Sequence, residues 1–321
     1  MTVQYAAPLQ RGWERMRRFL LEPFNLATWL TLAFTAWLAR LGSGGGPGSL
    51  WNVGDSDGRH KVVDNISDAW ASLMAHAFVL PLIVFAVLVA LAILLVVVWL
   101  SSRGQLMFLD NVVHGRALIA EPWRRFKRLG DSLFLWRVGF GLACLLVVVS
   151  VLALVLGPAI LAGSWRDPLA GLSIAAAILG GLVMVVLALV AIVVSLLLDS
   201  FVVPVMYRYD LTTTAAWRSL LPWLHAYPGH FILYALFVLL LAVVMAVCAA
   251  LVCMVTCFAC CIWLIPLVGS YVMTAVLLPL WVTYRAFTVE WLAQLDPKFD
   301  LFALASSAAA PAAEAPAPAE G

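Results

Sequence analysis

Six long apolar segments limit what this chain can fold into. They lie near residues 24–41, 77–100, 133–162, 169–198, 231–257 and 262–284. A helix that crosses the hydrocarbon layer needs about 20 mostly apolar residues, because that layer is about 30 Å thick and a helix rises about 1.5 Å per residue. The sequence therefore predicts an all-α, polytopic membrane protein with six transmembrane helices.

The composition excludes an ordinary water-soluble domain. Hydrophobic residues make up 64% of the chain and charged residues 11%, whereas a soluble domain has about 45–50% and 25%. The formal net charge of +2 is too small to indicate nucleic-acid binding, and the basic residues flank the apolar segments instead. Membrane lipids are therefore the expected partners.

The chain divides into three parts. Residues 1–23 are expected to form a cytoplasmic amphipathic interfacial segment, residues 24–300 the six-helix transmembrane domain, and residues 301–321 a disordered Ala/Pro-rich tail without an apolar face. The first apolar segment is longer than a signal-peptide core and lacks a cleavage site, so we expect it to be retained. The Gly-rich stretch that follows it cannot cross lipid, because its backbone groups need water.

The distribution of Lys and Arg predicts the orientation. With six crossings, fifteen Lys and Arg residues fall on the side of the two termini and four on the opposite side. Positively charged loops stay in the cytoplasm. The sequence thus predicts a protein of the bacterial inner membrane with both termini in the cytoplasm and the Gly-rich loop outside.

A basic heptad that begins with Trp occurs twice. "WERMRRF" covers residues 13–19, "WRRFKRL" covers residues 123–129, and "WRSLLPW" at 217–223 is a degenerate third copy. In the two basic heptads the apolar residues fall at positions one, four and seven, which form one stripe on a helix. We interpret the chain as three units, each an interfacial helix followed by a two-span hairpin.

The basic faces of these heptads are candidates for contact with anionic lipid headgroups. Each Lys or Arg near an anionic leaflet contributes about 1 kcal/mol, and Trp prefers the headgroup level. The alternative is a solvated basic face that only fixes the topology. The candidate lipid contacts are Arg15, Arg17, Arg18, Arg124, Arg125, Lys127 and Arg128.

Charged residues near membrane depth offer a second candidate site. Six lie near the expected cytoplasmic helix ends: Asp110, Arg137, Asp199, Arg208, Asp210 and Arg285. A charge at the bilayer centre costs about 2.5–3.5 kcal/mol on insertion scales, so such residues tend to be paired or functional. They could form ion pairs that lock the units together or line a polar cavity open to the cytoplasm. The candidate cavity or ion-pair network is Asp199, Arg208, Asp210 and Arg285.

No pattern of catalytic, cofactor-binding or metal-binding residues stands out. The cysteines from Cys253 to Cys261 lie on one apolar segment, where packing is the favoured interpretation and a disulfide or a metal site the alternatives. The five histidines show no ligand spacing, and no nucleotide-binding or hydrolase signature is present. The sequence therefore predicts no cofactor.

Several segments together resemble a known group of proteins. "SRGQLMFLDNVVHG", "EPWRRF", "VVPVMY", "AWRSLL" and "PLWVTYRAFTVEWLAQLDP" follow one another in order. With these segments, the chain resembles a family of uncharacterised bacterial six-span membrane proteins over roughly residues 10 to 300. In architecture it is similar to the membrane domain that accompanies some glycerophosphodiester phosphodiesterases. The resemblance implies the topology and no active site, since no phosphodiesterase domain follows.

We therefore expect a non-enzymatic integral membrane protein with a scaffolding or transport-associated role. One alternative is a transporter or channel subunit with a polar cavity that faces the cytoplasm. Another is a membrane enzyme that acts on lipid headgroups. A polar cleft would favour transport, a dry apolar bundle would favour a scaffold, and convergent carboxylates and histidines would favour the enzyme.

Overall fold

The described part of the chain is helical throughout. The computed structural model describes residues 4–41, 79–161, 174–256, 266–303 and 305, and no β-sheet occurs among them. The helices are α1 (Ala6–Leu20), α2 (Leu26–Arg40), α4 (Val79–His114), α5 (Ala120–Arg125), α6 (Lys127–Leu161), α7 (Ile174–Leu197), a π-helical turn (Leu198–Val202), α8 (Val203–Tyr209), α9 (Thr213–Ala226), α10 (Pro228–Thr256), α11 (Pro266–Val276), α12 (Leu278–Leu295) and a 3-10 turn (Pro297–Phe299).

Four of the described helices are long and apolar enough to cross a membrane, which is typical of a multi-pass membrane protein. They are α4, α6, α7 with its continuation to Tyr209, and α10. A fifth is obtained if α11 and α12, which are bent by 65°, count as one crossing. The sequence predicted six. The difference arises at α2, whose 15 residues rise only about 22 Å, and at the bend between α11 and α12.

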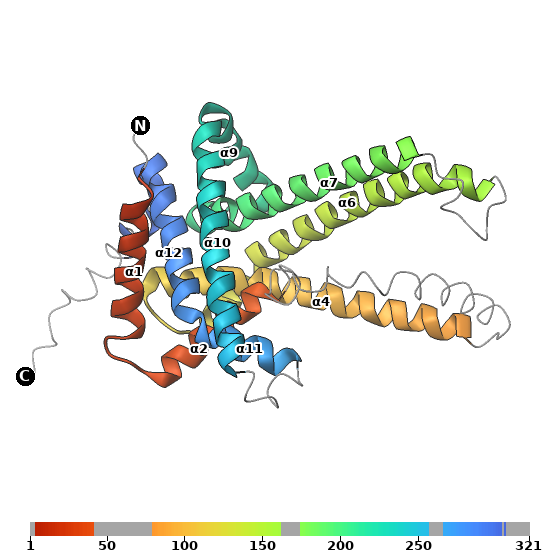
Figure 1. The fold of residues 1–321 in the computed structure, drawn as a ribbon. Helices are drawn as coiled ribbons and strands as arrows, with labels where there is room; N and C mark the ends of the chain where they lie inside the picture. The colour runs from red at the N-terminus through yellow and green to blue at the C-terminus, as the bar shows by residue number, and fades with distance from the viewer. Residues whose placement is uncertain (1–3, 42–78, 162–173, 257–265, 304, 306–321) are drawn as a thin grey trace, which may run out of the picture.

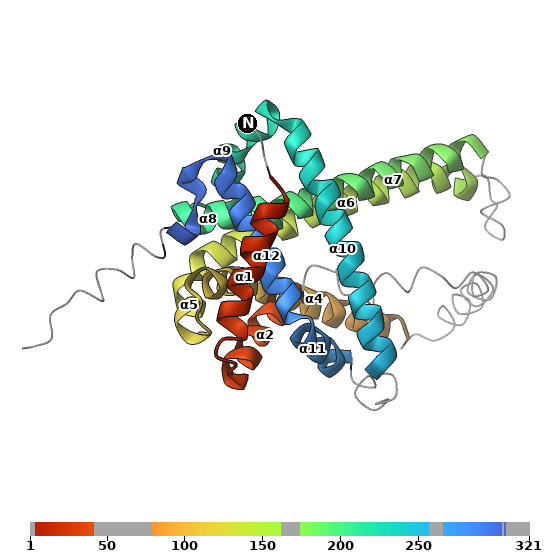
Figure 2. The same cartoon turned by 60° about the vertical axis from the view of Figure 1, so that its left-hand side comes forward.

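The long helices diverge from a common base. α6 and α7 run side by side as one arm and α4 forms a separate arm, whereas α10 runs at a steep angle to both (Figures 1 and 2). Their apolar side chains are exposed along most of their length, as at Leu94, Leu145 and Leu189. A helix that is apolar on all sides suits a lipid environment.

The base of the arms holds the main hydrophobic core. There α1, α2, α8, α9 and α12 pack around the ends of α4, α6, α7 and α10. Phe201 of the π-helical turn contacts Tyr234 of α10 and Trp291 of α12, with ring centroids 4.7 Å and 5.2 Å apart. Tyr234, Phe201 and Trp291 are fully buried, so this aromatic cluster joins three parts of the chain. We call this base the junction.

Helix α1 packs antiparallel along α12. Gln4 at its start exchanges two hydrogen bonds with Gln294, at 2.9 and 3.0 Å. Gly12 faces the α12 backbone, where an added Cβ would lie 3.1 Å from the carbonyl oxygen of Thr283. Met16 is fully buried. The apolar stripe of the first heptad is therefore covered by protein at Met16, because α12 offers an apolar surface there, whereas Trp13 stays exposed.

The sequence predicted that the second heptad forms one continuous amphipathic helix, but the structure divides it. It is divided between α5, which ends at Arg125, and α6, which begins at Lys127. Its Trp123 lies beside the guanidinium of Arg103, 5.2 Å from the ring centroid, whereas Trp13 of the first heptad is 48% exposed. Equal sequence patterns thus have different surroundings, since each helix packs on a different neighbour.

The C-terminal boundary also differs from the prediction. Leu301 and Phe302 are buried in the junction, and the Phe302 ring stacks under Arg15 at 3.8 Å. The folded part therefore extends past residue 300, because two apolar residues follow the 3-10 turn. The Gly-rich stretch from residue 42 and the tail from residue 306 lie outside the described residues.

Candidate functional site

Two groups of charged side chains lie inside the junction, where the apolar arms begin. The first surrounds Asp199 in the π-helical turn, and the second surrounds Asp110 near the end of α4. A π-helical turn inserts a residue into a helix and often occurs at functional sites. Here it directly follows the apolar α7, so the first charged residue after that helix falls within the turn.

The Asp199 group joins three helices. Arg137 of α6 donates to Asp199 Oδ1 at 2.8 Å, and Gln105 of α4 donates to the same oxygen at 3.1 Å. The hydroxyls of Ser101 and Ser102 lie 3.5 and 3.4 Å from Arg137 Nη1. One carboxylate therefore orients donors from two arms, and the Arg137 side chain is only 13% exposed.

Arg285, on α12, also reaches the π-helical turn that carries Asp199. Its guanidinium donates to the backbone carbonyl of Asp199, and it forms no ion pair with the described residues. Its Nε and Nη2 are buried without a hydrogen-bond partner in the described part of the chain. The neighbouring Tyr284 hydroxyl lies 3.3 Å from Ser200 Oγ. Two guanidiniums thus approach one acidic residue.

A cavity of about 210 Å³ opens beside the Arg137–Asp199 pair. It combines two charges with apolar and aromatic walls from α4, α6, α7 and the π-helical turn. The lining residues are Val98, Trp136, Arg137, Phe140, Gly141, Ser195, Leu198 and Asp199.

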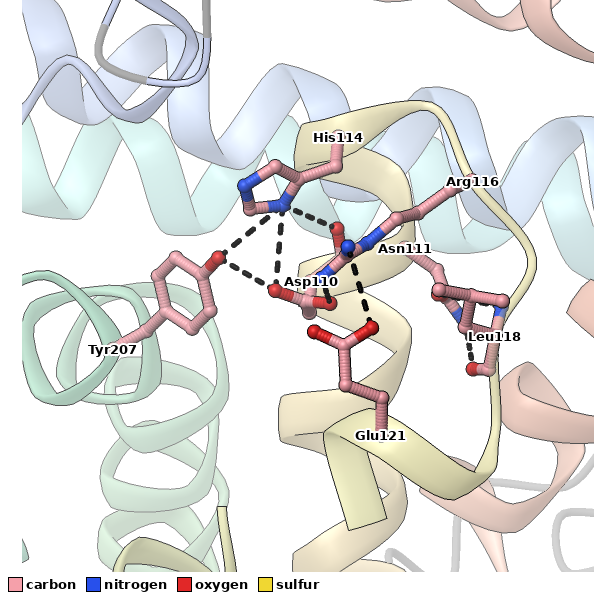
Figure 3. Close-up of polar contacts among 7 residues, drawn as sticks. All are labelled: Asp110, Asn111, His114, Arg116, Leu118, Glu121 and Tyr207. Atoms are coloured by element: carbon pink, nitrogen blue, oxygen red, sulfur yellow. Dashed lines mark hydrogen bonds and ion pairs between the residues drawn. The ribbon is translucent and has the colours of Figure 1, made fainter. Parts of the chain in front are cut away.

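The Asp110 group is more completely buried. Asp110 has no exposed surface and accepts hydrogen bonds from Tyr207 at 2.8 Å and from Arg116 at 3.0 Å. Its Oδ1 also lies 3.3 Å from Nδ1 of His114. Figure 3 shows Tyr207 facing this carboxylate from α8 and Glu121 reaching Arg116 from α5, at 3.6 Å.

The chemistry of the Asp110 group is that of a structural ion pair. Burial by itself lowers the pKa of Arg116, but the hydrogen bond and the charge of Asp110 outweigh it and raise that pKa, so the guanidinium stays charged. Asn111 adds two hydrogen bonds that close the following turn on Leu118. Both oxygens of Asp110 are thus occupied, which suits the joining of α4 to α8 more than proton transfer.

The four residues of the predicted cavity do not all meet. Asp199 and Arg285 come together through the Asp199 carbonyl. Arg208 instead donates to the Lys298 carbonyl at 3.3 Å, and Asp210 pairs with Arg128 at the surface. The four residues therefore make three separate contacts, because α8 ends at Tyr209 and carries Arg208 and Asp210 away from the π-helical turn.

The predicted lipid contacts fall into two kinds. Three form ion pairs within the protein: Arg15 with Glu290, Arg17 with Glu22, and Arg128 with Asp210. The others form no ion pair with the described residues and are exposed on α1, α5 and the start of α6: Arg18, Arg124, Arg125 and Lys127. The side chains of the three paired residues are also exposed, by 47%, 61% and 66%, so all seven can reach headgroups.

The sequence analysis missed Gln105 and placed Arg137 outside the candidate site. It ended the second apolar segment at residue 100, whereas α4 continues to His114. A signal was present, since Ser101, Ser102, Arg103 and Gln105 follow the apolar run directly and are buried. Such small and polar residues next to a span are typical of contacts between membrane helices.

No three His, Cys, Asp or Glu side chains of the described residues come together in a metal-binding arrangement. Within the range from Cys253 to Cys261, only Cys253 lies in the described part of the chain. Packing, a disulfide and a metal site therefore stay alternative predictions for that segment.

Comparison with known proteins places the chain in a family without an assigned activity. Residues 6–302 match a family of unknown function, DUF7544. No curated protein and no solved structure matches the chain. Because the match covers nearly the whole sequence, the chain belongs to this family.

Proposed function

We propose that the protein is a non-enzymatic, multi-pass protein of the bacterial inner membrane with a role in transport. The observation that carries this proposal is the cavity beside Arg137 and Asp199, which lies among helices otherwise suited to lipid. Charges at such a position are costly and tend to mark a pathway or a binding site. A scaffold needs only apolar contacts between its helices, so the polar cavity favours transport.

Contact between the two ends of the chain supports an even number of crossings. Gln4 bonds to Gln294, and α1 lies along α12. The outer face of α1 carries exposed Arg11, Arg17 and Arg18, and charges of this density do not enter lipid. The contact therefore favours placing both ends in the aqueous region of one side.

The end of α4 supports a crossing by α2. Leu109 and Val113 of α4 pack in the same core as Met16 of α1 and Leu292 of α12, so the end of α4 belongs to the side of the termini. Helix α4 crosses once, and a second crossing must precede it. Among the described helices between α1 and α4, only α2 is available, and bilayer thinning can accommodate its short length at a modest cost.

The same reasoning applies to α10 and α11. Leu220 of α9 lies in the core shared with α12, and α10 crosses once between them. A return crossing then falls to α11 together with α12, which count as one candidate crossing with a 65° bend. Helix α11 packs against α2 through the bond of Trp37 to Ser270 and that of Tyr271 to the Leu30 carbonyl. We propose six crossings, in which α2 and the bent α11–α12 segment join the four long helices. The excess of Lys and Arg favours the cytoplasm for the two termini.

Thiol labelling tests the transport role without knowledge of the substrate. In a variant that lacks the six native cysteines, Ser195→Cys places a thiol on the cavity wall. A transporter that exposes the cavity to both sides should let a charged, membrane-impermeant methanethiosulfonate label this thiol in inside-out and right-side-out vesicles. Labelling from one side only, or from neither side, would contradict the transport role.

Ser150→Cys is the matched control for the labelling. Ser150 is exposed on the same helix that carries Arg137, and its hydroxyl bonds only to the Leu146 carbonyl. It does not line the cavity. We expect no labelling by the charged reagent and full labelling by a lipid-soluble maleimide, because this position faces lipid in the proposed topology.

The Asp110 group is the place where the enzyme alternative can be tested. Asp110 lies 3.3 Å from His114, and Glu121 reaches the Arg116 that pairs with Asp110, but both Asp110 oxygens are occupied. The purified protein incubated with phosphatidylglycerol and phosphatidylethanolamine should therefore yield no product on thin-layer chromatography. Product formation that is lost in His114→Gln would favour the enzyme instead.

A further inference from the structure

We propose that the cavity beside Arg137 binds the anionic, phosphate-bearing headgroup of a membrane amphiphile. The inference rests on the proposed function, because it assigns a ligand class to the same cavity. It follows from the charge balance around Asp199, the nature of the cavity walls and the helices that lead away from the cavity.

The charge balance around Asp199 calls for a negative group. Arg137 and Arg285 approach one acidic residue. Arg137 lines the cavity and bonds to the carboxylate, as Gln105 also does. Arg285 lies behind the lining residues and bonds only to the Asp199 backbone carbonyl. Arg285 is 7% exposed, and two of its nitrogens have no partner among the described residues. A buried charge that is not compensated costs several kcal/mol. An anion beside the pair would reduce this cost, whereas a cation would increase it.

The size and walls of the cavity suit a headgroup. Its volume of about 210 Å³ is several times the share of one water molecule, about 30 Å³. Trp136 and Phe140 stack at 5.3 Å between ring centroids, and Trp217 stacks on the other side of Trp136 at 5.6 Å. The guanidinium of Arg137 supplies charge-assisted donors for phosphate oxygens, and the rings supply an apolar wall.

The surroundings favour a lipid over a free anion. The same helices continue from the cavity into segments with exposed apolar side chains, such as Leu94 (56%), Leu145 (55%) and Leu189 (61%). Acyl chains attached to a bound headgroup could lie along these segments. An inorganic anion would use only the polar end of the cavity.

Two glycines of α6 allow a clean test. A Cβ built at Gly141 or at Gly139 meets no atom within 4 Å, so a side chain can begin at either position without displacing a neighbour. Gly141 lines the cavity and Gly139 does not. Gly141→Leu should therefore fill the cavity while the ion pair stays intact, and Gly139→Leu is the matched control.

The experiment measures lipid binding to the full-length protein by native mass spectrometry and by the shift in its melting temperature. The probes are phosphatidylglycerol, phosphatidylcholine and inorganic phosphate. We expect phosphatidylglycerol to bind at least tenfold more tightly than phosphatidylcholine. Gly141→Leu should weaken that binding at least tenfold, and Gly139→Leu should change it less than twofold.

Three results would overturn the inference. These are equal affinity for the two lipids, an unchanged affinity in Gly141→Leu, and binding of inorganic phosphate without binding of phosphatidylglycerol. A double variant, Arg137→Gln with Asp199→Asn, should also lose the preference for the anionic lipid, because it removes the guanidinium that donates to the phosphate without leaving Asp199 unpaired. Lipid binding as expected, combined with thiol labelling from one side only, would retain this inference and contradict transport.

Discussion

Single buried charges hold the junction together, and Asp110 is the clearest case. It is fully buried and accepts from two helices and a turn. We expect Asp110→Asn to lower the free energy of unfolding by about 3–5 kcal/mol, the usual effect of removing one partner of a buried ion pair. Thermal unfolding in detergent measures this change in the free energy of unfolding. Glu121→Gln, at a 56% exposed carboxylate, should cost less than about 1 kcal/mol, and equal effects would refute the assignment.

The Arg137–Asp199 pair predicts non-additive stability effects. Removing one charge leaves the other unpaired in a partly enclosed position, where the Arg137 side chain is 13% and the Asp199 side chain 32% exposed. Arg137→Gln and Asp199→Asn should therefore each destabilise the protein, and the double variant should lose less than their sum. Coupling of about 0.5–3 kcal/mol is expected for residues in contact. The unfolding curves of the wild type, the two single variants and the double variant give the coupling free energy. Arg128 and Asp210, paired at the exposed surface, form the control pair, and similar coupling there would contradict the importance of burial.

The sequence identified most of these side chains but not their partners. Asp110, Arg137, Asp199 and Arg285 stand out because charges are rare in such a chain. Which of them meet depends on where α4 ends and on the extra residue in the π-helical turn. Neither feature has a clear pattern in the residues, because helix ends inside a core are set by packing more than by local preference.

Helix contacts depend on glycines where backbones approach closely. A Cβ at Gly104 of α4 would lie 2.6 Å from the backbone nitrogen of Ala39 in α2, and one at Gly12 would lie 3.1 Å from the Thr283 carbonyl in α12. Gly104→Ala should therefore cost about 1–3 kcal/mol through overpacking and Gly12→Ala less. Gly139→Ala should be neutral or slightly stabilising. Melting temperatures in any other order would contradict these contacts.

The sequence predicted the long helices well and the short ones poorly. Helices α4, α6, α7 and α10 each cover most of a predicted apolar segment, since length and hydrophobicity suffice to recognise them. The position of α1 was not predictable, because an amphipathic stripe fits a membrane surface and another helix equally well. The divided second heptad shows the same limit.

Reporter fusions test the arrangement of the whole chain. If the six proposed crossings exist, fusions within residues 42–78, 162–173 and 257–265 should report an extracytoplasmic position, and fusions at either terminus or at Gly115 a cytoplasmic one. A four-crossing protein in which α2 and α11 stay on one side would instead place all three of these segments in the cytoplasm and Gly115 outside. Alkaline phosphatase and green fluorescent protein fusions distinguish the two patterns.

The bonds between Gln4 and Gln294 have a consequence for biosynthesis. Helix α12 leaves the ribosome long after α1, so α1 cannot dock on it until the long helices between them have been made. Docking of α1 therefore comes after the synthesis of those helices. A truncated or stalled chain would leave the underside of α1 uncovered and would offer quality-control proteases a recognisable mark.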